Sequence, residues 1–140
     1  MTITELIQFN SQELEQMAEL MQILDPTLLL TLQKLQQTVD CHTCHLYVMR
    51  DEDRIIGCYT ICIFYSPTGK KASVEDVVVH TDYQGQHLGK QLMTHAIEEL
   101  KQLAPIHVQL TSRPSRVSAN GLYKAVGFRM KETNVYVMDL

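Results

Sequence analysis

Positive charge and long apolar runs are both scarce in this sequence. Its 12 Lys and Arg are outnumbered by 16 Asp and Glu, which gives a formal net charge of −4. Because nucleic-acid binding needs a clustered basic surface, we expect no nucleic-acid partner. No apolar run approaches the ~20 residues that cross a bilayer, and the N-terminal segment lacks the basic start and apolar core of an export signal. We therefore expect a cytoplasmic protein without a membrane partner.

Tryptophan is absent and aromatic residues make up only 6% of the chain, but apolar residues overall reach 45% and charged residues 20%. This balance is typical of an ordinary globular protein and argues against disorder. No internal repeat, low-complexity tract or Pro/Gly/Ser linker divides the chain. We therefore expect a single domain over residues 1–140.

The spacing of apolar residues predicts a mixed α/β domain with one dominant sheet. The expected elements, in order, are a strand at 3–9, a helix from Ser11 with Ser11 as its cap, a helix from Asp25-Pro26 to about Val39, strands at 45–49 and 54–64, a buried strand at 72–79, a helix at 88–103, a strand at 106–110, a helix at 116–126 capped by Ser115, and two final strands at 128–130 and 134–138. This order predicts a single mixed, mostly antiparallel sheet flanked by helices.

A glycine-containing turn joins the buried strand to the amphipathic helix that follows it. The strand ends in Val77, Val78 and Val79, and the turn over residues 84–90 contains Gly85 and Gly89. Such a turn directs backbone N–H groups outward at a helix N-terminus, where the helix dipole favours an anion. A phosphate or pyrophosphate is the natural ligand, although a tight turn without a ligand explains the same spacing.

Two motifs resemble those of the GNAT family of acyl-CoA-dependent N-acetyltransferases. Gln84-Gly85-Gln86-His87-Leu88-Gly89 resembles its motif A, Gln/Arg-x-x-Gly-x-Gly/Ala after a strand. Leu122-Tyr123-Lys-Ala-Val-Gly127-Phe128 resembles its Leu-Tyr-x-x-x-Gly-Phe signature. The order and separation of the elements also match, so the chain is similar to a bacterial-type member of the family over essentially its whole length.

The resemblance implies acetyl-CoA as co-substrate and a primary amine as acceptor, either a small molecule or a protein amine. It implies that the amine attacks the thioester directly, that the N–H near Val79 polarises the thioester carbonyl, and that Tyr123 protonates the departing thiolate. Arg116 and Asn120 share a helix face with Tyr123 and are candidate cofactor contacts. The expected cofactor-binding residues are Val77, Val78, Val79, Gln84, Gly85, Gln86, His87, Leu88, Gly89, Lys90, Arg116, Asn120 and Tyr123.

Two positions depart from the family pattern. His87 stands where the family often has Gly, so its side chain either crowds the pyrophosphate or adds a favourable charge. Arg116 stands where the family often has Asn, seven residues before the tyrosine. The family often forms dimers through strands, which implies a homodimer here.

Glu75 is the candidate general base, because it lies on the same strand two residues before Val77. Strand alternation predicts that Asp76 faces the other side of the sheet, so that the two carboxylates form no pair. Glu75 as a surface residue and Tyr123 as a core residue remain alternatives. A non-catalytic acyl-CoA-binding or regulatory module on the same fold is the alternative function.

Cys41-His42-Thr43-Cys44-His45 matches the C-x-x-C-H pattern of c-type haem attachment. The absence of an export signal argues against haem, and a zinc site on these residues lacks a second half. Cys58 and Cys62 share a strand face and join them only if the fold brings them together. We therefore expect reduced thiols and no metal site.

Overall fold

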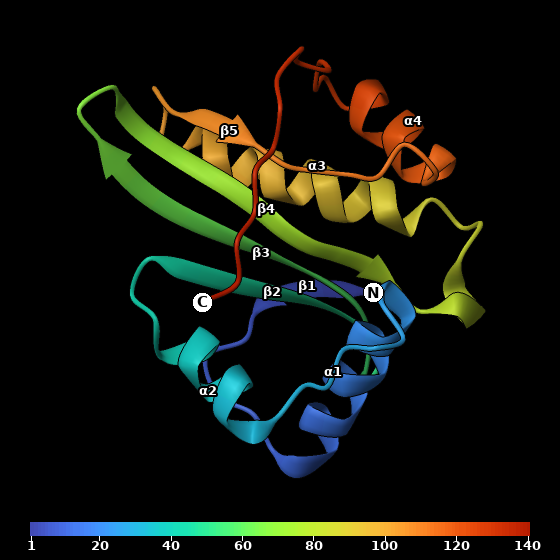
Figure 1. Cartoon of the computed structure of the whole chain (residues 1–140). Coiled ribbons are helices and arrows are strands. Elements are labelled where there is room, and N and C mark those ends of the chain that lie inside the picture. Colours follow the sequence, from blue (N-terminus) through green and yellow to red (C-terminus); the bar gives the residue numbers. More distant parts are fainter.

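A five-stranded sheet forms the centre of the computed structural model, which describes all 140 residues (Figure 1). Its strands lie side by side in chain order: β1 (Thr2–Glu5), β2 (Cys44–Asp51), β3 (Arg54–Ser66), β4 (Gly69–Val79) and β5 (His107–Gln109). Neighbours from β1 to β4 are antiparallel, and β5 runs parallel to β4. The expectation of a mixed, mostly antiparallel sheet is confirmed.

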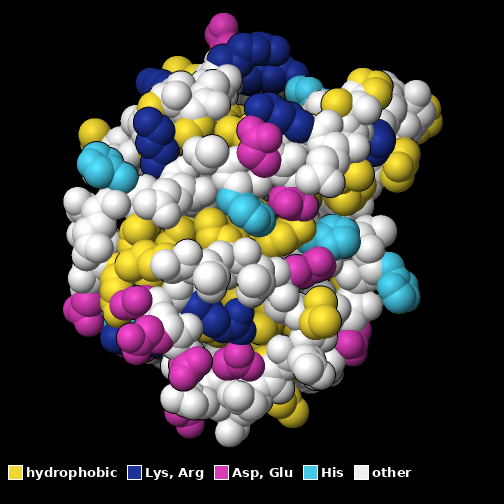
Figure 2. Space-filling model, turned by 180° about the vertical axis from the view of Figure 1, so that it is seen from behind, with side chains coloured by type: hydrophobic (Ala, Val, Ile, Leu, Met, Phe, Trp, Pro, Cys, Tyr) yellow, Lys and Arg dark blue, Asp and Glu magenta, His cyan; other side chains and the backbone are white.

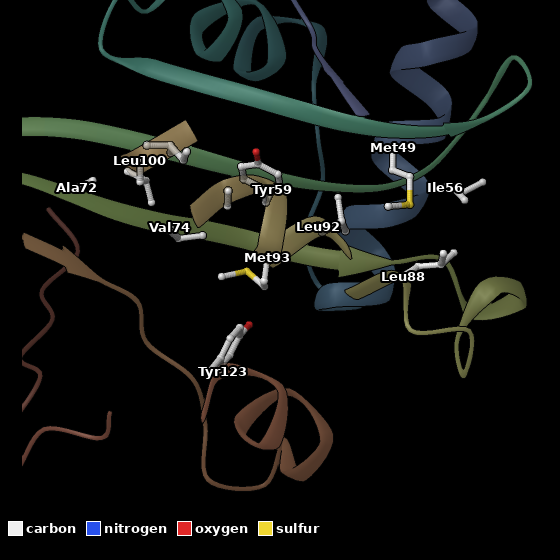
Figure 3. Close-up of a cluster of buried hydrophobic side chains, with 12 residues drawn as sticks. Met49, Ile56, Tyr59, Ala72, Val74, Leu88, Leu92, Met93, Leu100 and Tyr123 are labelled. Atoms are coloured by element: carbon white, nitrogen blue, oxygen red, sulfur yellow. The ribbon is translucent and has the colours of Figure 1, made fainter. Parts of the chain in front are cut away.

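Helices cover both faces of this sheet (Figure 1). On one face, α1 (Ser11–Leu24) and α2 (Leu32–Asp40) enclose a core that includes Leu20 and Val48. On the other, α3 (Leu88–Lys101) contributes Leu92 and Met93 to a second core, which Tyr123 of α4 (Val117–Ala125) also joins (Figure 3). A short 3-10 helix, η1 (Thr81–Tyr83), lies between β4 and α3.

The starts of the predicted helices need correction. Asn10, rather than Ser11, caps α1: its Oδ1 accepts from Glu13 N at 2.8 Å, and the Glu13 carboxylate accepts from Asn10 N at 3.0 Å. The second helix begins at Leu32 with Thr31 as its cap, not at Pro26. The Asp25 carboxylate instead accepts from the Thr27 N–H and hydroxyl, which closes a turn of its own. Arg116, rather than Ser115, stands at the N-cap of α4.

The two strands expected after α4 are absent, so that prediction is wrong. Residues 129–140 form no helix or strand and are exposed, and they cross the view from β5 towards β2 (Figure 1). A strand requires a partner for its backbone hydrogen bonds. The apolar alternation was present in the sequence, but β5 is only 3 residues long and offers little edge to pair with.

A bulge interrupts β4 where it passes Tyr59. The β3–β4 register runs from Thr60↔Glu75 to Cys58↔Val78, so that two residues of β4, Asp76 and Val77, lie opposite one residue of β3. Asp76 has a positive φ of 53°. Because a bulge adds one residue, it breaks the two-residue alternation of side chains beyond it.

Candidate functional site

The edge of β4 is open beyond its first residues. β4 pairs with β5 only from Lys71 to Ser73, after which β5 ends and the chain leaves towards α4 (Figure 1). On the β3 side, His80 N donates to Ile56 O at 2.7 Å. Antiparallel strands alternate between hydrogen-bonded and non-bonded pairs, so Val79 directs its own N–H and C=O towards the open edge. An edge of this kind accepts an extended chain with amide groups.

The turn after β4 leaves room at the start of α3. Gly85 has a φ of 79°, and a Cβ placed there would meet no atom within 4 Å. The N-cap of α3 is His87, which makes no side-chain capping bond, and the first intrahelical bond runs from Gln91 N to His87 O at 3.2 Å. The N–H groups before Gln91 therefore have no partner within the helix. Their dipole and the space at Gly85 suit a phosphate group.

His87 is one of the two departures from the family pattern, and its backbone conformation is unusual for a residue with a side chain. Its φ of 60° lies in the left-handed region, which glycine adopts without steric penalty and other residues do not. His87 and Lys90 line a surface hollow of about 480 Å³ along α3. Gly89 faces the opposite way, since a Cβ there would lie 3.2 Å from Leu122 of α4. The two basic side chains thus flank the turn on the side away from α4.

The other residues that line this hollow are Ile3, Gln91, Thr94, His95 and Glu98. Figure 2 shows the back of the molecule, where histidine and acidic side chains gather beside exposed hydrophobic atoms.

His80 holds the turn against the rest of the fold. The side chain is buried, its Nδ1 accepts from Asp82 N at 3.1 Å, and its Nε2 lies 2.9 Å from Glu19 Oε1 of α1. His80 is thus the N-cap of η1. Gln84 donates from Nε2 to Val79 O at 3.2 Å, so this expected cofactor residue closes the turn through its side chain.

Tyr123 reaches from α4 towards Met93 of α3 (Figure 3). Only 7% of the side chain is exposed. Burial raises the pKa of the phenol, and the Arg116 guanidinium partly opposes that rise. The phenol therefore stays protonated at neutral pH, as a proton donor must.

Two polar side chains lie in or beside the loop before α4. The Asn120 side-chain amide nitrogen donates to the carbonyls of Arg113 and Arg116, each at 2.9 Å, so it fixes the loop. Ser112 has the one buried side-chain oxygen or nitrogen without a hydrogen-bond partner. Ser112 lies beyond Gln109, the last residue of β5, in the segment that leads to α4. No sequence pattern marked this serine.

A cavity of about 490 Å³ lies between α1, α2 and the sheet. Glu75 and Asp76 both line it, so the expectation that alternation separates them is wrong: the bulge brings both carboxylates to one cavity. Ser73 Oγ donates to the Glu75 carboxylate. Desolvation raises the pKa of Asp76, and the charge of Glu75 adds to the rise. The other lining residues are Met17, Met21, Leu30, Lys34, Leu35, Gln37, Thr38, Cys41, Cys44, Leu46, Cys58, Thr60 and Cys62.

Most of the chain, including both motifs, matches one known protein family. The model of the acetyltransferase (GNAT) family matches residues 13–128, which include both motifs. The chain belongs to this family of transferases. No helix of this GNAT domain is long and apolar enough to cross a membrane, and no three His, Cys, Asp or Glu side chains are grouped so that they could hold a metal ion.

Relatives of this GNAT chain match it over part of their length. It is 38% identical over 63 residues to an uncharacterized N-acetyltransferase, ycf52, of Pyropia yezoensis. The matched segment covers 45% of this chain and 34% of that protein. It is 36% identical over 58 residues to the [ribosomal protein bS18]-alanine N-acetyltransferase of Escherichia coli K12, covering 41% and 39%. The chain thus matches between a third and two fifths of the length of these curated relatives.

Solved structures match over almost the entire fold. An aminoglycoside acetyltransferase from an uncultured soil metagenomic sample, in complex with sisomicin, superposes with a TM-score of 0.83 over 99% of this chain and 95% of that one, at 17% identity. At this identity the likeness shows the GNAT fold alone. It confirms the predicted fold class.

Proposed function

We propose that this GNAT protein transfers the acetyl group of acetyl-CoA to a primary amine by direct attack within a ternary complex. The observation that carries the proposal is the position of β4. Its bulge turns two carboxylates into one cavity, and the next residues, Val77–Val79, form the open edge that leads to the uncapped end of α3. A donor along the edge and an acceptor in the cavity therefore meet at one short stretch of strand.

The turn and the open edge supply the contacts for the acyl donor. The N–H groups at the start of α3 suit the pyrophosphate. Lys90 adds positive charge beside it, and the His87 imidazole offers a further polar contact. The backbone of Val77–Val79 pairs with the amides of pantetheine. The outward N–H of Val79 donates to the thioester carbonyl and stabilises the negative charge that develops on its oxygen. The unpartnered Ser112 hydroxyl is a further candidate contact.

Carboxylates and a phenol supply the proton transfers. An amine enters as an ammonium and must lose a proton before it attacks. We assign this step to the Glu75–Asp76 pair, because both carboxylates face the cavity and the raised pKa of Asp76 makes it the stronger base. Tyr123, protonated by virtue of its raised pKa, donates to the departing thiolate.

The acceptor class is a primary amine of a small molecule or a protein. The names of the relatives include both kinds, a ribosomal protein and an aminoglycoside. The cavity combines apolar walls with two carboxylates, which suits an ammonium group on an apolar stem.

Turnover with a panel of primary amines tests the proposal, with the acetylated product detected by mass spectrometry. We expect product with the wild-type protein and a loss of roughly 100-fold or more in kcat for Tyr123→Phe, the usual contribution of a general acid. Glu75→Gln and Asp76→Asn should lower kcat/KM most at low pH, where free amine is scarce. Binding of acetyl-CoA without product from any amine would instead favour the alternative, a non-catalytic acyl-CoA-binding or regulatory module.

We also propose a cytoplasmic homodimer. Large apolar side chains are exposed along the C-terminal segment, and exposed apolar surface often marks an interface. They are Met130, Val135, Tyr136, Val137 and Met138. The four free cysteines fit a reducing compartment. Sedimentation analysis of the full chain with and without residues 130–140 tests the dimer.

A further inference from the structure

The C-x-x-C-H motif has no part in the transfer proposed above, yet all four cysteines line the acceptor cavity. Cys41 is the C-cap of α2, Cys44 begins β2, and Cys58 and Cys62 lie on β3. Of the two cysteines on β3, Cys62 is the one that the fold brings next to the motif. The Sγ atoms of Cys44 and Cys62 lie 3.7 Å apart.

The strand register sets Cys44 and Cys62 directly opposite each other. Ile63 N donates to Thr43 O at 2.8 Å, so Thr43 and Ile63 form a hydrogen-bonded pair and the next pair, Cys44 and Cys62, is non-bonded. Cα atoms of such a pair are about 4.5 Å apart, which lies within the roughly 4.4–6.8 Å range that a disulfide spans. The two thiols can be joined without a change of register.

Cys41 lies one turn away and differs from its neighbours. Cys44 N donates to Cys41 O at 3.2 Å, which closes the turn, and Cys41 Sγ lies 3.6 Å from Thr43 Oγ1. Hydrogen bonds from the Cys44 thiol and from Thr43 lower the pKa of Cys41 to about 7. Burial, and the bond to Cys41, raise the pKa of Cys44 to about 12. At neutral pH the site therefore pairs a nucleophilic thiolate with a neighbouring thiol.

We propose that Cys41, Cys44 and Cys62 form a site of reversible disulfide formation that reacts with hydroperoxides on the wall of the acceptor cavity. The Cys41 thiolate attacks a peroxide oxygen, which forms Cys41–SOH and releases an alkoxide or hydroxide. The Cys44 sulfur then attacks the Cys41 sulfur, its proton leaves with the hydroxyl group as water, and a Cys41–Cys44 disulfide forms. One peroxide is reduced for each pair of thiols oxidised.

Cys62 extends the site by thiol–disulfide exchange. Its sulfur attacks Cys44 and releases Cys41 as the thiolate, which is the better leaving group because its pKa is the lower one. The product is the cross-strand Cys44–Cys62 disulfide, and the reactive Cys41 is free again. Cys58 is 1% exposed and donates to Asp76 O at 3.6 Å, and burial raises its pKa. It is therefore the inert thiol of the four.

Peptide mapping of the intact chain tests the site and needs no variant. The reduced protein is treated with a small excess of hydrogen peroxide, alkylated and digested. We expect one intramolecular disulfide that contains Cys44, joined to Cys41 or Cys62, and its complete loss after reduction with dithiothreitol. An absence of disulfide, a disulfide that excludes Cys44, or links between chains only would overturn the proposal.

Single variants separate the roles of the thiols. Cys41→Ser should slow disulfide formation at least tenfold, whereas Cys58→Ser, the matched control, should react as the wild type does. Cys44→Ser should leave Cys41–SOH without a partner, so that dimedone labels Cys41. Circular dichroism verifies that each variant is folded. Equal slowing by Cys41→Ser and Cys58→Ser would contradict the assignment of Cys41 as the reactive thiol.

The pH dependence of alkylation checks the same assignment. Iodoacetamide should modify Cys41 with a midpoint near pH 7, below the value of about 8.5 for a free cysteine. The charged groups that line the cavity with Cys41 are Lys34 of α2 and Glu75 and Asp76 of β4. A midpoint at or above 8.5 would contradict the hydrogen-bonded thiolate.

A consequence for acetyl transfer rests on the proposed function. Because the disulfide alters the wall of the acceptor cavity and leaves the turn at α3 untouched, we expect oxidation to raise the acceptor KM at least threefold and to leave acetyl-CoA affinity unchanged. A mapped disulfide with an unchanged acceptor KM would overturn this link to the cavity. Because peptide mapping requires no turnover, failure of the thiol site remains distinguishable from failure of the proposed transfer.

Discussion

Two single residues, Tyr123 and His87, lie at the two ends of the proposed site. Tyr123 is held between α4 and α3, in contact with the core that includes Met93. His87 takes a backbone conformation that glycine adopts more easily. The sequence motifs located both residues, but they did not say that one is buried and the other strained.

Replacing Tyr123 by Phe tests the phenol alone, because ring and packing stay the same. We expect kcat to fall roughly 100-fold or more while acetyl-CoA affinity and the unfolding midpoint stay within error. Calorimetric titration and steady-state kinetics measure the two effects separately. A parallel loss of cofactor affinity would mean that the hydroxyl binds the donor instead of protonating the thiolate.

At position 87, glycine relieves the strain of the left-handed backbone, whereas alanine retains it. His87→Gly removes the left-handed strain, which costs about 1–2 kcal/mol for a residue with a side chain. The greater entropy of the unfolded glycine chain lowers the free energy of unfolding by about 0.4–1 kcal/mol. We expect His87→Gly to be more stable than His87→Ala by about 1 kcal/mol in urea unfolding. Both variants lack the imidazole, so a shared loss of acetyl-CoA affinity would show that the imidazole contributes to binding.

Among the elements, β4 combines the features on which the site depends. Its existence as a strand and its link to α3 followed from the sequence pattern, because a run of valines and a glycine turn are local signals. Its open edge did not, since the valine run predicts a strand at the centre of a sheet. The bulge at Asp76 did not follow, since no glycine marks it and it exists only relative to Tyr59 of the neighbouring strand. The start of α2 was missed because the Asp25 turn imitates a helix cap. The final strands were predicted wrongly because alternation alone does not supply a partner.

The open edge of β4 is tested by removing one N–H group. Val79→Pro removes a donor that points away from β3, so the sheet should lose little stability. Transfer should fall roughly 100-fold, the usual effect of losing one donor to a developing oxyanion. Val78→Pro is the matched control, since the N–H of Val78 points to β3 and its loss removes a hydrogen bond of the β3–β4 ladder, which should destabilise the fold. Unchanged kcat in Val79→Pro would exclude the N–H of Val79 from the mechanism.

On the scale of the whole molecule, the sheet carries one hydrophobic core on each face. One core packs against α3 and α4, where we propose that the donor binds, and the other packs against α1 and α2, where we propose that the acceptor enters. The fold class could be predicted from element order and two motifs, because these reflect the layers of the domain. The residues that line the acceptor cavity could not, since α1, α2, β2, β3 and β4 each contribute to it.

The carboxylate pair affects the stability of the whole domain as well as its chemistry. A carboxyl group with a raised pKa binds its proton more tightly in the folded state, so the folded state loses stability as the pH rises above the unfolded pKa of about 3.9. We expect Asp76→Asn to raise the unfolding midpoint at pH 7 and to leave it nearly unchanged at pH 3. Thermal unfolding at the two pH values measures this. A lower midpoint at pH 7 would mean that ionised Asp76 stabilises the fold.

Calorimetric titration with acetyl-CoA tests whether this chain binds the acyl donor. The proposed transfer requires that the turn at Gly85 and the edge at Val77–Val79 bind it. Free CoA and dephospho-CoA serve as companions that separate the acetyl and ribose phosphate contributions. We expect acetyl-CoA to bind with a Kd in the micromolar range or tighter, and free CoA to bind as well. No detectable binding at millimolar acetyl-CoA would contradict the account and show that the GNAT fold is used here without its donor.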